Sequence, residues 1–203
     1  MSVYKIQITN RDYSEWTIYD TNNFETVSID VNPVTNKLFS NDTFKVNKNN
    51  TVHVIHSSVK VDGDIPGVLI LNGNKTYGRN AKGKMLYKCN PDDARLPSFL
   101  IPYDIKHVGF SKVFHNLYVT FSFVDWTDKH PIGSLSKVIG EVNILHNFYE
   151  YQLYCKSLNA SIQKFQKATS KVIQQNSHEK FIDTMKIKYP LIEDRTSKKW
   201  YIF

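Results

Sequence analysis

The N-terminal part of the chain alternates between apolar and polar positions in short runs separated by Asn- and Asp-rich breaks. A first group of such runs comprises Tyr4–Thr9, Trp16–Tyr19, Val27–Val31 and Val52–Ile55. A period of two residues is typical of half-buried antiparallel strands, because successive side chains of a strand point to opposite faces of the sheet. Breaks such as Asp20–Asn23 have turn chemistry, so we expect each run to be a separate strand.

A second group of strand-like runs begins just after Pro66. It comprises Gly67–Leu71, Lys84–Tyr87, Ser98–Ile101 and Leu117–Val124. Each group has the length of a small five-stranded barrel, and the OB-fold is a barrel of this size that binds nucleic acid along one face. Two groups of this kind favour two small barrels over one sandwich.

The pattern changes to a helical one after Gly140. Apolar residues then recur at spacings of four, three, four and three, which places them on one face of a helix; they are Ile144, Phe148, Tyr151, Cys155 and Leu158. We expect further helices over Ile162–Gln174 and His178–Lys188, the last ended by Pro190.

The predicted fold class is therefore mainly β with C-terminal α, as two tandem OB-fold (cold-shock-like) barrels followed by a helical connector. Residues 1–60 are expected to form a reduced first barrel, and residues 64–126 the second. Residues 127–203 are expected to form the helical connector and the start of a further region.

Composition narrows the class of partner and the compartment. The chain has 26 Lys and Arg against 19 Asp and Glu, and this net charge of +7 favours anionic partners. Two isolated cysteines, Cys89 and Cys155, are neither a disulfide framework nor a zinc signature. No apolar run approaches the ~18 residues of a membrane span. We expect a soluble, intracellular protein, either cytoplasmic or nuclear.

A basic run with interleaved tyrosines lies between positions 75 and 88 and contains no acidic residue. Cations neutralise phosphates and aromatic rings stack on bases, so the run predicts a platform for single-stranded RNA. A solvated hairpin whose tyrosines pack inward explains the same residues. The candidate RNA-binding residues are Tyr77, Arg79, Lys82, Lys84 and Tyr87.

The sequence offers no catalytic or metal-binding residue. His53 and His56 would point to opposite faces of a strand, which is poor geometry for one metal ion. Adjacent acids such as Asp92 and Asp93 are explained by turn chemistry, whereas a two-metal nuclease needs several carboxylates that converge. We therefore expect no cofactor in this chain.

Several motifs resemble those of the RNase II/RNase R family of exoribonucleases. The segment 126–140 resembles the way these enzymes leave their second cold-shock domain. The segment 67–78 resembles the first hairpin of that barrel, and 91–97 resembles the connector before a later strand. The residues of this chain that coincide with positions of the family pattern are Trp126, Pro131, Gly133, Gly140 and Glu150.

The last residues, 195–203, resemble the point where this family enters its catalytic (RNB) domain. Trp200–Phe203 has strand character, and the aspartate cluster that follows in the family is not in the sequence. The resemblance implies the RNA-binding N-terminal portion of a 3′–5′ exoribonuclease that itself lacks the catalytic aspartates. Mg²⁺ is then expected only in the catalytic domain. The alternative is a stand-alone, non-catalytic nucleic-acid-binding or assembly protein derived from that family.

Two partners follow from this interpretation. The first is single-stranded RNA. The second is a catalytic RNB half, or another polypeptide, that would pack on Trp200–Phe203. No membrane partner is expected.

The missing aspartate cluster generates a direct prediction. The purified chain should not hydrolyse a 3′-overhang RNA in Mg²⁺ or Mn²⁺, because no site for two metal ions can be built from its carboxylates. A gel assay of product release measures this. RNA turnover that disappears on mutating one of the chain's own acidic residues would contradict the prediction.

Overall fold

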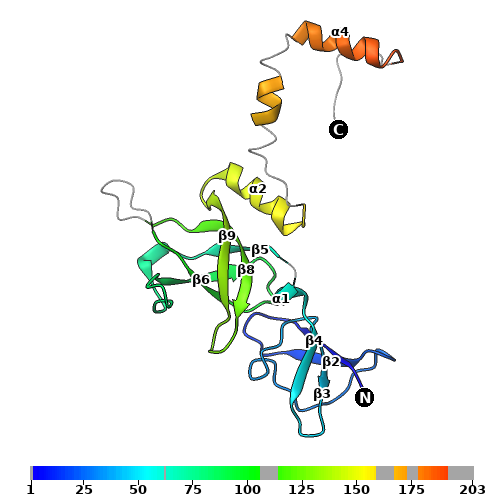
Figure 1. The fold of residues 1–203 in the computed structure, drawn as a ribbon, viewed down its shortest axis with the longest axis vertical. Coiled ribbons are helices and arrows are strands. Elements are labelled where there is room, and N and C mark those ends of the chain that lie inside the picture. The colour runs from blue at the N-terminus through cyan, green and yellow to red at the C-terminus, as the bar shows by residue number, and fades with distance from the viewer. Residues whose placement is uncertain (1, 62, 106–113, 159–166, 173–177, 192–203) are drawn as a thin grey trace. The chain divides into compact units, whose positions relative to one another are not determined.

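The computed structural model describes residues 2–61, 63–105, 114–158, 167–172 and 178–191 (Figure 1). The chain divides into two compact units, Met1–Ala160 and Ser161–Phe203. The first unit holds all the named strands, which form one open sheet and one closed barrel.

The N-terminal sheet is antiparallel, with strand order β2-β1-β3-β4. Its strands are β1 (Tyr4–Ile8), β2 (Trp16–Asp20), β3 (Thr43–Val46) and β4 (Val52–His56). The alternation in the sequence thus predicted β1, β2 and β4, whereas β3 was not predicted. Their inward positions form the buried face, where Ile6, Ile8, Ile18 and Phe44 are almost fully covered.

The prediction that residues 1–60 form a reduced first barrel is not confirmed, because the described residues 2–60 form an open sheet of these four strands. Val27–Val31 was expected to be a strand but is irregular, next to an isolated bridge between Thr26 and Tyr19. Asn32 supplies the physical reason. Its side-chain carbonyl accepts hydrogen bonds from the amides of residues 34 and 35 at 2.9 and 3.1 Å and so begins a turn directly after the run. Within the run, the Val31 amide donates to the Ile29 carbonyl at 2.8 Å, a three-residue turn that interrupts the extended course.

A closed five-stranded barrel follows, with strand order β5-β6-β7-β9-β8. Its strands are β5 (Ile65–Leu69), β6 (Leu86–Pro91), β7 (Phe99–Pro102), β8 (Leu117–Asp125) and β9 (Ile132–Glu141). Pairing of β5 with β8 closes the barrel, and β7 and β9 are its one parallel pair among the described strands. The interior is apolar and includes Leu69, Cys89, Phe99, Ile101, Val119 and Phe121.

The barrel extends past the boundary expected at residue 126. Its fifth strand, β9, lies in the segment that was assigned to the helical connector. Gly133 looked like part of a turn, but it lies inside β9. A Cβ atom there would lie 2.8 Å from the ring of Phe121, so the glycine permits a close approach within the strand. Trp126 follows directly after the end of β8, as expected, and its side chain is buried.

The helices agree with the sequence where the structure describes them. α2 (Leu145–Cys155) and α4 (His178–Lys188) were both expected, and residues 167–172 of the predicted helix over 162–174 are helical. Two short elements, α1 (Ser58–Val61) and η1 (Asn72–Asn74), were not predicted. No helix among the described residues is long and apolar enough to cross a membrane. The prediction for 200–203 lies outside the described residues.

Helix α2 is fixed to the barrel by an aromatic stack and a buried ion pair. Tyr151 stacks on Tyr118 of β8 with ring centroids 4.3 Å apart. The ammonium of Lys137 on β9 donates hydrogen bonds to Glu150 at 2.6 Å and to the hydroxyl of Tyr154 at 2.7 Å. Because Glu150 is only 1% exposed, removal of the Lys137 cation by substitution would leave its carboxylate buried without a charged partner.

The sheet and the barrel share one hydrophobic core through Phe39, which lies in the loop before β3. Its ring stacks on Phe99 at 5.9 Å, meets Phe123 edge-on at 5.6 Å and packs on Trp126 at 4.9 Å. Phe39 itself is completely buried. The two β regions therefore form a continuous core rather than two separate ones.

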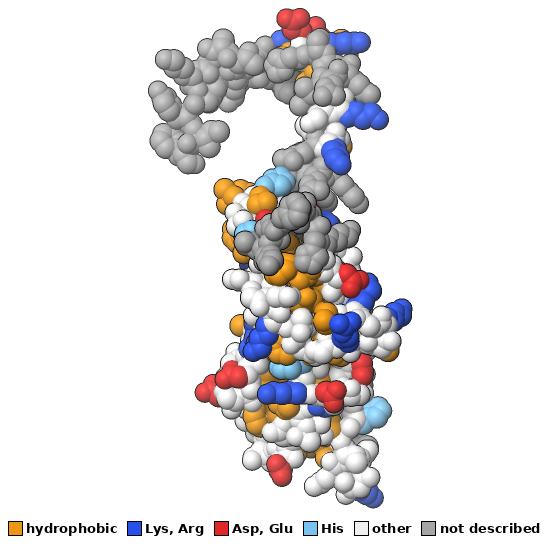
Figure 2. Space-filling model, turned by 90° about the vertical axis from the view of Figure 1, so that its left-hand side faces the viewer, with side chains coloured by type: hydrophobic (Ala, Val, Ile, Leu, Met, Phe, Trp, Pro, Cys, Tyr) orange, Lys and Arg blue, Asp and Glu red, His pale blue; other side chains and the backbone are white. Residues whose placement is uncertain are grey.

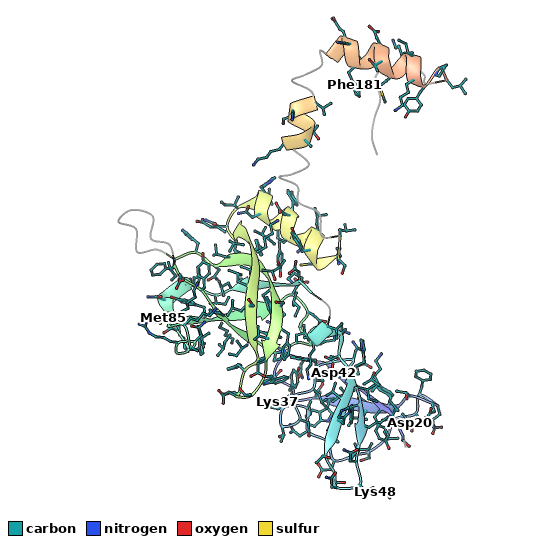
Figure 3. The ribbon with its side chains drawn as sticks, viewed as in Figure 1. Asp20, Lys37, Asp42, Lys48, Met85 and Phe181 are labelled. Atoms are coloured by element: carbon teal, nitrogen blue, oxygen red, sulfur yellow. The ribbon has the colours of Figure 1, made fainter. Side chains whose placement is uncertain are left out.

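Polar contacts reinforce this junction. The Arg11 guanidinium donates to the carbonyl of Pro91 at 2.6 Å. The Lys37 ammonium donates to the carbonyl of Asp128 at 2.9 Å and lies over the Trp126 ring. Lys37 is labelled in Figure 3. Each bond joins a loop of the N-terminal sheet to a segment of the barrel.

The shared core predicts a large effect of one aromatic side chain on both regions. Phe39→Ala should lower the free energy of unfolding by roughly 3–5 kcal/mol, because it empties the centre of the junction. Phe24→Ala is the matched control, since Phe24 is 77% exposed; it should change the free energy by less than about 0.5 kcal/mol.

Urea denaturation followed by circular dichroism measures both variants. Equal effects of the two substitutions would show that Phe39 does not hold the regions together.

Candidate nucleic-acid interface

The basic run between positions 75 and 88 is a hairpin that leads into β6. The amide of Tyr77 donates to the carbonyl of Leu86 at 2.9 Å, which pairs the two arms. Asn80 closes the turn, because its side-chain carbonyl accepts hydrogen bonds from the amides of Lys82 at 3.0 Å and Lys84 at 2.9 Å. The sequence thus encodes the turn through one asparagine.

The three cations chosen from the sequence are all exposed on this hairpin: Arg79, Lys82 and Lys84. The Arg79 guanidinium donates to the carbonyl of Gly83 at 3.2 Å, within the same turn. Lys84 forms an ion pair with Asp104 at 2.8 Å, with both side chains about half exposed or more. Such an exposed pair contributes little stability, so a phosphate group can compete for the lysine.

Tyr77 has the surroundings of a base-stacking residue. Its ring is half-buried, with the Lys75 ammonium 5.5 Å from the ring centroid. On another side the ring meets His130 edge-on at 6.4 Å. A partly exposed ring that neighbours hold in place, with a cation beside it, suits stacking on a base next to a phosphate.

Tyr87 is placed differently, and its predicted role in RNA contact loses its geometric basis. The residue is 3% exposed, and its hydroxyl donates to Asn74 at 3.1 Å. Burial raises the pKa of that hydroxyl, and the charge of Asp104 adds to the effect. The alternation of side chains along a strand is the reason. Tyr87 and Cys89 lie on the inward side of β6, whereas Lys88 between them is more exposed. The inward-packed alternative therefore holds for Tyr87.

A cleft of about 480 Å³ adjoins the hairpin, between the N-terminal sheet and the barrel. Its charged and aromatic lining residues include Arg11, Asp12, Lys88, Trp126, Lys129 and His130. Three permanent cations face one carboxylate there, so the cleft carries a positive charge. Contact between Tyr77 and His130 links it to the hairpin. Figure 2 shows Lys and Arg side chains, with Asp and Glu side chains between them, on one face of the described strands.

Sequence reasoning missed most of this cleft. Its lining residues come from positions as distant as 11, 88 and 130, which only the tertiary fold brings together. One signal was present. Lys88 belongs to the basic run. Because successive side chains of a strand point to opposite faces, Lys88 was expected on the opposite face of β6 from Tyr87.

The described residues contain no group of three or more His, Cys, Asp and Glu side chains that could hold a metal ion. The acidic pair near position 92 has structural partners instead. Asp92 accepts a hydrogen bond from the Tyr151 hydroxyl at 3.2 Å, and Asp93 pairs with Arg95 at 2.8 Å.

No protein-family model matches this chain, and no curated protein matches it. The resemblance to the RNase II/RNase R family therefore rests on the sequence motifs alone.

The positive charge of the cleft has a measurable consequence at His130. Burial lowers the pKa of the imidazole, and Lys129 and Lys88 lower it further, while a backbone hydrogen bond at Ser98 opposes them. On acidification His130 should therefore take up its proton below the ordinary value of about 6.5. Lys129→Gln should raise the titration midpoint, since it removes a repelling charge.

Nuclear magnetic resonance of the imidazole protons follows this titration. Lys48→Gln, in a turn of the N-terminal sheet (Figure 3), is the control and should leave the midpoint unchanged. A midpoint at or above the ordinary value would refute the positive character of the cleft.

Proposed function

We propose that this chain binds single-stranded RNA and is the RNA-guiding N-terminal portion of an RNase II/RNase R-like 3′–5′ exoribonuclease, without catalytic aspartates of its own. The observation that carries the proposal is the contact between Tyr77 and His130. It joins the loop between the first and second barrel strands to the loop between the fourth and fifth.

We further propose that the barrel is of the OB type. Its first strand pairs with both the second and the fourth, and its third strand pairs with the fifth. In OB barrels, the face of the second and third strands and these same two loops bind oligonucleotides. The basic hairpin and His130 occupy those loops in this chain, and Lys88 lies on the second strand.

The chemistry of the surface supports RNA as the ligand. Exposed cations at 79, 82 and 84 offer charge to phosphates, and the Tyr77 ring between a lysine and a histidine offers a face to a base. Contacts of these two kinds are largely independent of sequence, because every nucleotide has a phosphate and a flat base. The expected binding is therefore weak in sequence preference and strongly dependent on salt.

Fluorescence anisotropy with a labelled single-stranded RNA tests the proposal across a range of salt concentrations. Tyr77→Ala should weaken binding by roughly 1–3 kcal/mol if its ring stacks on a base. A combined Arg79/Lys82/Lys84→Ala variant should also reduce the slope of log affinity against log salt by about two, since each phosphate contact contributes about 0.7.

The matched control removes the same charge elsewhere. A combined Lys5/Lys45/Lys48→Ala variant alters only the N-terminal sheet and its turn. It should retain most of the slope of log RNA affinity against log salt concentration. Unchanged affinity in both hairpin variants would place RNA binding elsewhere on the chain, or rule it out.

A further inference from the structure

His130 lies where the basic hairpin and the cleft meet. It belongs to the loop between β8 and β9 and lines the cleft. Its side chain is half-buried, so part of the imidazole is accessible to a ligand. The ring meets the Tyr77 ring edge-on at 6.4 Å, so a strand of RNA whose base stacks on Tyr77 passes close to it.

The hydrogen bonding of His130 limits what its neutral form can do. The imidazole bonds the backbone of Ser98, and this bond favours the charged form of the ring, so the ring is the donor and the carbonyl is the acceptor. A neutral imidazole has one N–H, and Ser98 accepts it. The other ring nitrogen can donate to a phosphate oxygen only after it has bound a proton.

The surroundings of His130 oppose that proton in the free protein. Burial lowers the pKa of the imidazole, and the charges of Lys129 and Lys88 lower it further. The other charged or titratable residues around the ring are Arg11, Asp12 and Tyr13 in the cleft, and Tyr77 with Lys75 on the hairpin. Because the ordinary pKa of histidine is about 6.5, the free protein keeps His130 neutral at neutral pH.

A phosphate at this position reverses the balance. Its negative charge attracts the proton that the lysines repel, and its oxygens accept the hydrogen bond that a protonated ring offers. We propose that His130 contacts a phosphate of bound RNA as an imidazolium, so that RNA binding at this site takes up one proton from the buffer. This inference rests on the proposed RNA binding and adds its regulation by pH.

Linkage fixes the direction of the effect. If bound RNA raises the pKa of His130, protonation of His130 strengthens RNA binding by the same factor. The gain appears as the pH falls from the pKa of the complex to that of the free protein, and it is complete below the latter. A charge of opposite sign within reach shifts a pKa by about 1–3, so the affinity should rise roughly tenfold or more between about pH 7.5 and about pH 5.

Fluorescence anisotropy with labelled oligouridine at constant ionic strength measures this change, since uracil does not titrate in that range. Wild-type protein should show a slope of log affinity against pH that approaches about −1. His130→Gln keeps a donor for Ser98 but cannot take up the proton, so its affinity should lose most of the pH dependence. His53→Gln on β4 is the matched control and should keep it.

Nuclear magnetic resonance gives a second readout, which a purely structural role of His130 would not change. The titration midpoint of the His130 imidazole should rise by about 1 or more when oligouridine saturates the protein, whereas that of His53 should stay in place. If His130→Gln does not fold, Lys129→Gln replaces it. Loss of that repelling charge should move the pH range of the affinity change upward, together with the His130 midpoint.

The outcomes separate this inference from the RNA proposal. RNA bound with the same affinity across the pH range, with an unchanged His130 midpoint, would overturn the proton uptake and leave RNA binding intact. A pH dependence that persists in His130→Gln would also overturn it, because another group would then bind the proton. No binding of oligouridine at any pH would overturn both proposals.

Discussion

The packing of the Phe39 side chain between the N-terminal sheet and the barrel is the interaction on which the rest of the described fold depends. One ring from a loop touches Phe99, Phe123 and Trp126, so neither β region has a complete core without the other. Aromatic rings bury much apolar area at little cost in conformational freedom, which makes one residue sufficient to join two sheets. The cleft follows from this junction, because Trp126 packs on Phe39 and also lines the cleft.

The barrel then acts as a frame for two loops. Closure by the pairing of β5 with β8 removes the exposed edges of the sheet and fixes where each connecting loop leaves it. Helix α2 adds to this rigidity through the Lys137–Glu150 pair. Binding groups on a rigid frame lose little freedom when a ligand arrives, so loops held by a closed barrel suit recognition of an extended strand.

The sequence pattern predicted much of this fold, because apolar and polar residues alternate along a strand that has one buried face. That signal predicted β1, β2 and β4, and it predicted α2 through its helical spacing. It failed at β9, where Gly133 signalled a turn although the ring of Phe121 is what requires a glycine there. It also counted Tyr87 as a surface residue, since composition ignores strand parity. The cleft was invisible to such reasoning, because no local pattern reports that Arg11 and Trp126 meet in space.

The order in which contacts become possible during synthesis follows from the topology. All strands of the N-terminal sheet lie within Tyr4–His56, so its pairings need only short stretches of chain. The barrel, in contrast, cannot close until β8 has been synthesised, because β5 pairs with β8. The parallel pair of β7 with β9 likewise requires the chain up to Ile132. Pairings of large sequence separation form slowly. A nascent chain therefore passes through a stage in which the sheet exists and the Phe39 side chain is exposed, because the barrel that buries it has not yet formed. Exposed apolar surface of this kind makes a folding intermediate prone to aggregation.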